Sequence, residues 1–262
     1  MPPSSTALEW PYPRWIAHRG AGRLAPENTL AAFRTGAAHG YRMYECDVKL
    51  SADGVPYLLH DAHLDRTTNG HGPVADWSWA ALSQLDAGRW HSIECAGEPL
   101  ATLAAVAAHC LTHGHGLNLE VKPVPGDAAR TGEGVAKAVQ SLWGRAARSA
   151  MRLTHDSLLA SAWPLMSSFD ANCLQAVHRT APELPTALLL DHLPPDWLQA
   201  AQALHCSAVV AHHSLWTQQA VEAVHQSGMR AASYTVNEAE TAKRLLTWGV
   251  DSLITDAVDR FN

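Results

Sequence analysis

The 262-residue chain has no long hydrophobic run and no cluster of basic residues. No segment approaches the ~20 consecutive apolar residues that a membrane-spanning helix requires, so we expect no stable membrane association. Lys and Arg nowhere form a run of five, and the formal net charge is −6. Because nucleic-acid binding depends on clustered positive charge, this composition argues against a nucleic-acid partner.

A regular cysteine pattern is also missing. The five cysteines are irregularly spaced, and no Cys-x-x-Cys pair occurs among them. This pattern fits reduced thiols better than a disulfide framework. The first ten residues, MPPSSTALEW, lack the charged start and the apolar centre of a secretory signal peptide. We therefore expect a soluble, cytoplasmic protein, whose oligomeric state the sequence leaves open.

Short apolar segments alternate with segments of helical periodicity along most of the chain. The apolar segments lie at 14–18, 43–50, 55–60, 116–121, 164–168, 186–190, 207–211, 230–236 and 252–255. Helical spacing is found at 102–111, 134–142, 196–204, 217–226 and 238–246. Such alternation predicts an α/β fold in which helices cover a parallel sheet.

The spacing of these strands favours a (β/α)8 TIM barrel, with an open doubly wound sheet as the alternative. Segments 43–50 and 55–60 are joined by four residues, which is too short for a parallel crossover, so they form an antiparallel hairpin. Eight parallel strands then remain. We expect one domain over 1–262, with a small insertion at about 62–99 on the rim of the barrel.

The stretch His18-Arg19-Gly20 follows a short buried strand and opens a loop. Asn28 or Thr29 is expected to cap the next helix, which runs to about residue 39. The end of a parallel strand is where α/β folds place their functional groups. His18 and Arg19 are therefore either part of a reactive site, or Arg19 forms a structural ion pair and His18 is an unrelated histidine beside it.

The predicted hairpin brings further polar groups to the same end of the sheet. A turn centred on residues 52–53 would place Glu45 opposite His60 and Asp47 opposite Leu58. A bulge at Gly54 would shift this register by one residue. In the first register, Glu45, Asp47 and His60 converge near the carboxyl end of one strand.

Strand 116–121 adds Glu120, and Lys122 follows two residues later on the same face. Together with Glu45 and Asp47, Glu120 offers the oxygen ligands that Mg²⁺ or Ca²⁺ prefers. Lys122 suits a phosphate oxyanion, although a plain salt bridge with Glu120 is the structural alternative.

Arg19 beside these groups also suits a phosphate. His18 and His60 titrate near neutral pH, as a general acid and a general base must. Asp61 alternates to the opposite strand face, so we expect it to support the local turn and not a metal.

A series of short motifs in this order resembles the glycerophosphodiester phosphodiesterase family. The motifs are His18-Arg19-Gly20, Pro26-Glu27-Asn28-Thr29, Glu45-x-Asp47, His60-Asp61, Glu120-Val121-Lys122-Pro123, Ser168-Phe169-Asp170, Thr235-Val236-Asn237 and Gly249-Val250-Asp251-x-x-Ile254-Thr255-Asp256. They span the chain from its first strand nearly to its end. Tyr234 precedes one of them where the family commonly has Trp.

The resemblance implies a TIM barrel that hydrolyses glycerophosphodiesters to glycerol 3-phosphate and an alcohol with one divalent cation. By position, the resemblance makes Glu45, Asp47 and Glu120 the metal ligands, and His18 and His60 the acid–base pair. It makes Arg19 and Lys122 the cations that bind phosphate. The aromatic residues that contact substrate are Phe169 and Tyr234. The resemblance leaves the preferred alcohol, the native metal and the separate roles of the two histidines open.

Two other functions remain compatible with the sequence. A phospholipase with the same catalytic set would require an exposed apolar rim, which Trp77, Trp79 and Trp90 could supply if they do not pack against the barrel. A non-catalytic binding protein on the same fold is the second alternative, and the presence of the complete set of motif residues argues against it.

Overall fold

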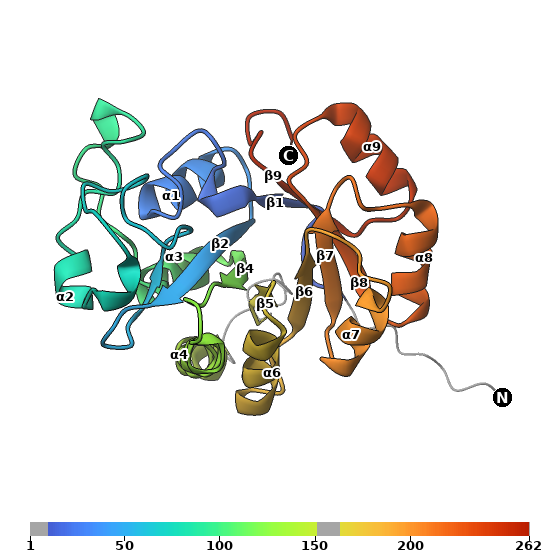
Figure 1. Ribbon diagram of the computed structural model, residues 1–262. Helices are drawn as coiled ribbons and strands as arrows, with labels where there is room; N and C mark the ends of the chain where they lie inside the picture. The colour runs from blue at the N-terminus through green and yellow to red at the C-terminus, as the bar shows by residue number, and fades with distance from the viewer. Residues whose placement is uncertain (1–9, 151–162, 262) are drawn as a thin grey trace.

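The computed structural model describes residues 10–150 and 163–261, and these form a closed barrel of alternating strands and helices (Figure 1). The expectation about a signal peptide rests on residues that lie mostly outside the described ranges. The parallel strands are β1 (Trp15–Ala17), β2 (Met43–Leu50), β4 (Gly116–Val121), β5 (Leu165–Ser168), β6 (Thr186–Leu190), β7 (Ala208–His212), β8 (Arg230–Tyr234) and β9 (Ser252–Thr255). β3 (Pro56–Leu58) pairs antiparallel with β2.

Helices surround these strands (Figure 1). They are α1 (Leu30–Ala38), α3 (Leu103–His113), α4 (Ala128–Ala150), α6 (Ala171–Thr180), α7 (Trp197–Ala203), α8 (Gln218–Gln226) and α9 (Ala239–Thr247). Thr29, and not Asn28, caps α1, because its side-chain oxygen accepts the backbone N–H of Ala32. Among the described helices, none is both long and apolar enough to cross a membrane.

Pairing between the first strand and its neighbours closes the barrel. β1 lies parallel to β9 on one side and to β2 on the other, so the eight parallel strands of the described chain form a ring. This confirms the TIM barrel, and the open doubly wound sheet is wrong. Closure matters for function because it brings the carboxyl ends of all eight strands to one mouth.

The predicted hairpin is confirmed, and of its two possible registers the structure shows the one shifted by one residue at Gly54, so the first register is wrong. Val48 faces Leu58 and Lys49 faces Tyr57, so Glu45 is not opposite His60 and Asp47 is not opposite Leu58. The cause is Gly54, which adds one residue to the turn. Its φ of +83° is a left-handed backbone conformation that glycine adopts without steric cost. His60 instead follows the end of β3 and reaches the mouth from a loop.

Apolar side chains fill the interior of the barrel below the mouth. Ile16, Met43 and Ile254 belong to this buried layer, together with Leu165, Ala187, Leu189, Ala208, Val210 and Ala232. Side chains on a strand alternate, so residues two positions further on point the same way. His18, Glu45 and Asp256 therefore stand one layer above the apolar filling.

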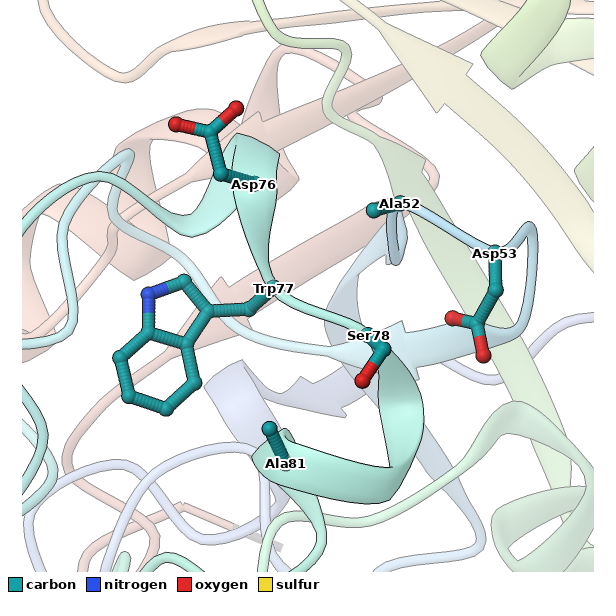
Figure 2. A pocket seen from close by; sticks show the side chains of 6 residues that line it. All are labelled: Ala52, Asp53, Asp76, Trp77, Ser78 and Ala81. Atoms are coloured by element: carbon teal, nitrogen blue, oxygen red, sulfur yellow. The ribbon is translucent and has the colours of Figure 1, made fainter.

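The segment between β3 and α3 covers one side of the mouth. It contains η2 (Val74–Asp76), α2 (Trp79–Leu82) and η3 (Ile93–Cys95), and its apolar residues form a cluster with Tyr57 and Leu59. Trp77 and Trp79 pack against this cluster. The segment contacts the hairpin turn directly, since the backbone N–H of Ala52 donates to the carbonyl of Trp77 at 2.9 Å. An open hollow beside this contact is lined by Ala52, Asp53, Asp76, Trp77, Ser78 and Ala81 (Figure 2).

Candidate active site

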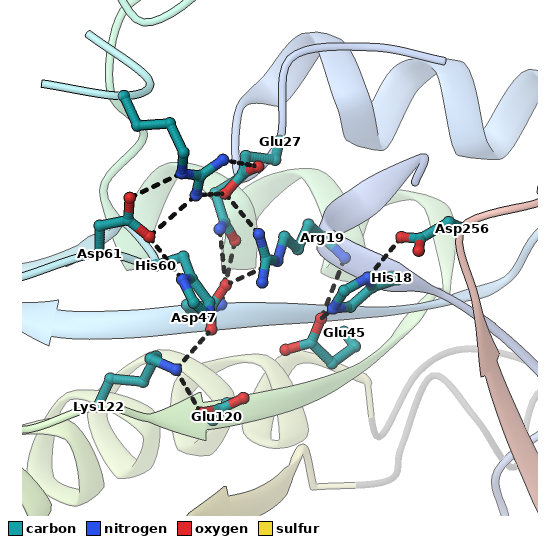
Figure 3. A network of polar contacts seen from close by, with 12 residues as sticks. His18, Arg19, Glu27, Glu45, Asp47, His60, Asp61, Glu120, Lys122 and Asp256 are labelled. Carbon is teal, nitrogen blue, oxygen red and sulfur yellow. Dashed lines mark hydrogen bonds and ion pairs between the residues drawn. The ribbon is translucent and has the colours of Figure 1, made fainter. Parts of the chain in front are cut away.

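His18 lies at the mouth of the barrel, where β1 passes into the turn η1 (His18–Gly20). Its Nδ1 is 2.6 Å from Oδ1 of Asp256, and its Nε2 is 3.7 Å from Oε2 of Glu45 (Figure 3). Burial alone would lower the pKa of His18, but the hydrogen bond to Asp256 and the charge on Glu45 outweigh it and raise the pKa. Asp256 in turn accepts a hydrogen bond from Asn237 at 3.2 Å.

Arg19 adopts a left-handed backbone conformation, with φ of 50°. Such a conformation is uncommon for a residue with a side chain and persists where the surroundings hold it. Here the backbone N–H of Arg19 donates to Oε2 of Glu45 at 3.0 Å. Its guanidinium contacts Glu27 at 2.8 Å and Asp47 at 3.5 Å, so both ends of Arg19 face the acidic groups.

Three carboxylates meet beside His18. Glu45 and Asp47 come from β2 and Glu120 comes from β4, where Asp47 and Glu120 are direct neighbours in the parallel register. One oxygen from each residue lies within 4.8 Å of the others, an arrangement that could hold a metal ion. Lys122 places its Nζ 2.8 Å from Glu120 and 3.6 Å from Asp47.

The electrostatics of this cluster fit a divalent cation. Burial, and then the charge on Asp47, raises the pKa of both Glu45 and Glu120. In addition, Oε1 of Glu45 is buried without a hydrogen-bond partner. A cation among these oxygens would favour their ionised forms and satisfy that oxygen.

Asp47 is held more firmly than its two neighbours. Its backbone N–H donates to Oδ1 of Asn28 at 3.0 Å, and Nδ2 of Asn28 donates to Oδ2 of Asp47 at 2.8 Å. Burial would raise the pKa of Asp47, but the charges of Arg19, His60 and Lys122 together lower it. Asn28 therefore orients a carboxylate of the cluster.

His60 approaches from the side opposite to His18 (Figure 3). Its Nδ1 is 2.7 Å from Oδ1 of Asp61, and the other oxygen of Asp61, Oδ2, contacts Nε of Arg66 at 2.7 Å. Arg66 bridges onward to Glu27 at 2.7 Å, behind Arg19. Burial and the nearby cations lower the pKa of His60, despite the charge on Asp47. Asp61 thus supports His60 and lies outside the group of three carboxylates.

The two predicted aromatic residues line a small cavity on the inner side of the carboxylates. The rings of Phe169 and Tyr234 meet edge to face, with centroids 6.0 Å apart. The complete lining is His18, Glu45, Asn118, Glu120, Ser167, Phe169, Leu189, Tyr234 and Ile254. Phe169 is 44% exposed, so one side of this cavity opens to solvent.

Three residues at the site have roles that the sequence did not indicate. Asp256 and Asn237 appeared in the motifs but had no assigned function, and Arg66 appeared in none. Asp256 is 238 positions from His18. One local signal could have identified Asp256: it lies two positions after the apolar Ile254, so on a strand both side chains point to the same side, toward the barrel interior and its mouth.

A fourth overlooked residue is Lys49. It lies on β2 and is only 3% exposed. Burial, and then the charge of Lys122, lowers the pKa of Lys49 to about 8. Alternation along the strand places it on the same face as Glu45 and Asp47.

Comparisons with known proteins agree with this geometry. Residues 18–260 match the model of the glycerophosphoryl diester phosphodiesterase family. The chain belongs to this family. It is 32% identical over 251 residues to a putative glycerophosphodiester phosphodiesterase, YhdW, of Bacillus subtilis, covering 93% of this chain and 94% of that relative. The phosphodiesterase therefore shares nearly the full length of this relative.

Two solved structures resemble the phosphodiesterase closely. A phosphodiesterase from Oleispira antarctica, in complex with the product sn-glycerol-3-phosphate, aligns with a TM-score of 0.82 and 31% identity over 95% of this chain and 94% of that one. A putative glycerophosphoryl diester phosphodiesterase from Silicibacter pomeroyi aligns with a TM-score of 0.78 and 28% identity over 93% and 90%. The fold of these two structures thus agrees with the family that the sequence comparison gives for this chain.

Proposed function

We propose that this phosphodiesterase hydrolyses small glycerophosphodiesters to glycerol 3-phosphate and an alcohol, using one bound divalent cation and two histidines. The observation that carries the proposal is the group of Glu45, Asp47 and Glu120 between His18 and His60. Relatives that cover nearly the whole chain support the reaction class. The glycerol 3-phosphate bound to the Oleispira antarctica enzyme supports the product.

Glu45, Asp47 and Glu120 would hold the cation, and their oxygens suit Mg²⁺ or Ca²⁺. When bound, such a cation would neutralise charge on the phosphodiester and make a neighbouring hydroxyl more acidic. Arg19 and Lys122 add two positive charges beside the same point, which positions the phosphate and stabilises charge that develops on it.

The two histidines are prepared for proton transfer by their carboxylate partners. Asp256 and Asp61 each occupy an Nδ1 atom, which leaves Nε2 of His18 and Nε2 of His60 to exchange protons with the substrate. One Nε2 takes the proton of a glycerol hydroxyl, which attacks phosphorus and forms a cyclic phosphate. The other gives a proton to the leaving alcohol, and water then opens the ring.

The inner cavity has a volume of about 30 Å³, too small to enclose glycerol, so we place the glycerol at the opening of this cavity, against Phe169 and Tyr234. The variable alcohol would then extend to the outer side of the carboxylates, toward the hairpin and the segment that follows it. We also retain the proposals that 1–262 is one domain with an insertion at about 62–99 and that the protein works in the cytoplasm. All five cysteines are unpaired, which supports a reducing compartment.

A product analysis tests this proposal. Purified enzyme with Mg²⁺ or Ca²⁺ should release glycerol 3-phosphate from glycerophosphocholine or glycerophosphoethanolamine, and the glycerol 3-phosphate should accumulate. Release of inorganic phosphate from glycerol 3-phosphate at a comparable rate would show that the reaction is wrong. A diester without the adjacent hydroxyl should not react; equal rates would exclude the cyclic intermediate but leave hydrolysis standing.

One observation favours lysophospholipids as a second substrate class. Among the described residues, Leu24, Trp90 and Ile93 are three of the four exposed large hydrophobic side chains. Their two segments are joined at the rim by His91 and the carbonyl of Arg23, 3.1 Å apart. Unlike Trp77 and Trp79, Trp90 does not pack against the apolar cluster of Tyr57 and Leu59. If this apolar rim receives an acyl chain, Ile93→Ser should slow cleavage of lysophosphatidylcholine but not of glycerophosphocholine.

A further inference from the structure

Lys49 is a buried cation that the chemistry proposed above does not use. It is 97% buried, and within the described part of the chain its ammonium has neither a hydrogen bond nor an ion pair. Its Nζ is not among the fully buried atoms that lack a hydrogen-bond partner, so the ammonium of this otherwise buried side chain keeps contact with solvent. A cation with solvent access and no partner among the described residues can bind an anionic group that arrives with a ligand.

The carboxylates near Lys49 are already engaged. Asp47 contacts Arg19, Lys122 and Asn28, and Glu120 contacts Lys122 at 2.8 Å. Asp61, the other nearby acid, is held by His60 and Arg66. The charges of these groups and of Lys122 still act on the pKa of Lys49.

The position of Lys49 along β2 shows which part of the substrate it would meet. Glu45 lines the inner cavity, Asp47 lies two residues nearer the carboxyl end of the strand, and Lys49 lies two residues beyond that. All three share one face. Across the hairpin, Lys49 pairs with Tyr57, which belongs to the apolar cluster under the covering segment. Lys49 is thus on the outer side of the carboxylates.

We propose that Lys49 binds an anionic group on the leaving alcohol, so that the enzyme prefers headgroups that carry a carboxylate or phosphate over headgroups that end in a quaternary ammonium. This inference rests on the proposed function, because it needs glycerol on the inner side and the variable alcohol on the outer side. A cationic headgroup is still cleaved, but it meets repulsion at Lys49, whereas an anionic one supplies the missing partner.

Three diesters of matched length test the proposal: glycerol phosphate esterified to 3-hydroxypropanoate, to propane-1,3-diol and to 3-hydroxypropyl-trimethylammonium. For the wild-type enzyme, kcat/KM should be at least about tenfold higher for the carboxylate than for the diol, and lowest for the ammonium. In Lys49→Met the carboxylate and the diol should differ by no more than about twofold. Lys137→Met is the matched control, because Lys137 is an exposed lysine on α4, and it should keep the wild-type ratio.

Comparison of ratios guards against partial misfolding, because the fraction of active enzyme cancels between substrates. Lys49→Gln, a second neutral variant, should give the same ratio as Lys49→Met. An unchanged ratio in both variants, or an equal loss on all three diesters, would overturn the proposal and leave hydrolysis standing. If the wild-type enzyme cleaves none of the three diesters, the proposed function fails as well, and that result is visible before any variant is made.

Discussion

At the scale of single residues, the site works through pairs in which one member positions the other. His18 depends on Asp256, His60 on Asp61, and Asp47 on Asn28. Each partner orients the side chain that it contacts and leaves that side chain's other polar atom free for substrate or metal. Mutation of the reacting residue should therefore remove its chemical step, whereas mutation of the positioning residue should only disturb the orientation of its partner.

Replacement of either histidine tests its part in proton transfer. Acid–base assistance contributes about 10²–10⁴-fold, so His18→Ala and His60→Ala should each lose at least about 100-fold in kcat. Both variants should still bind the metal, because neither histidine belongs to the carboxylate group. Steady-state kinetics with calorimetry separates the two effects. Near-normal turnover in either variant would remove that histidine from the mechanism.

Replacement of Glu120 tests the metal assignment. Glu120→Gln removes one charged ligand from the group, so we expect Mg²⁺ or Ca²⁺ affinity to fall at least about tenfold in calorimetry. Glu133→Gln is the control, since Glu133 is an exposed glutamate that pairs with Lys137 on α4. Unchanged affinity in Glu120→Gln would show that Glu120 is not a ligand.

At the scale of elements, the loop after β1 must approach the end of β9 closely for His18 to meet Asp256. The backbone N–H of Arg23 donates to the carbonyl of Asp256 at 3.3 Å. A glycine allows this approach: Gly22 has φ of +57°, and a Cβ atom there would lie 2.2 Å from the same carbonyl oxygen. The contact between the loop after β1 and the end of β9 thus depends on Gly22 having no side chain.

Gly22→Ala should therefore disturb both stability and activity. We expect it to lower the free energy of unfolding in urea by about 1–3 kcal/mol more than Gly40→Ala does. Gly40 is a fair control, because its φ of +88° carries similar strain but a Cβ atom there meets nothing within 4 Å. The same variant should reduce kcat, since the loop carries His18. Equal destabilisation by the two substitutions would contradict this account.

At the scale of the whole molecule, the carboxylates at the mouth make the free energy of unfolding depend on bound metal and on pH. The pKa values of Glu45 and Glu120 are raised in the folded, metal-free protein above their usual value of 4.5. The folded state thus holds protons that the unfolded chain has released, so this contribution to stability is lost as pH rises above that value. A bound cation offsets the loss because it binds the ionised carboxylates.

Divalent metal should accordingly stabilise the protein more at pH 8 than at pH 5. At a metal concentration of about 100 Kd, binding contributes about 2.7 kcal/mol, which corresponds to a rise in Tm of roughly 5–10 °C. At pH 5 protons compete for Glu45 and Glu120, so the rise should shrink. Differential scanning calorimetry with metal and with excess chelator measures both values. A rise that is independent of pH would contradict the assignment of these carboxylates.

The sequence by itself determined the elements of this protein and most of its site. Alternation of strands and helices and the short link after residue 50 predicted eight parallel strands and one hairpin, because these are local properties of the chain. Period-two spacing placed Glu45 with Asp47 and Glu120 with Lys122 on common faces. The motifs then named the family, which the family model and the relatives confirmed.

Tertiary structure decided what depends on contacts between distant residues. A left-handed Gly54 moved the hairpin register by one residue, which no count of alternating residues could settle. Barrel closure brought Asp256 to His18 across 238 positions. The burial of Lys49 without a partner arises because neighbouring carboxylates are taken by other cations. Register, pairing and burial are set by the whole packed molecule, and local sequence carries little of that information.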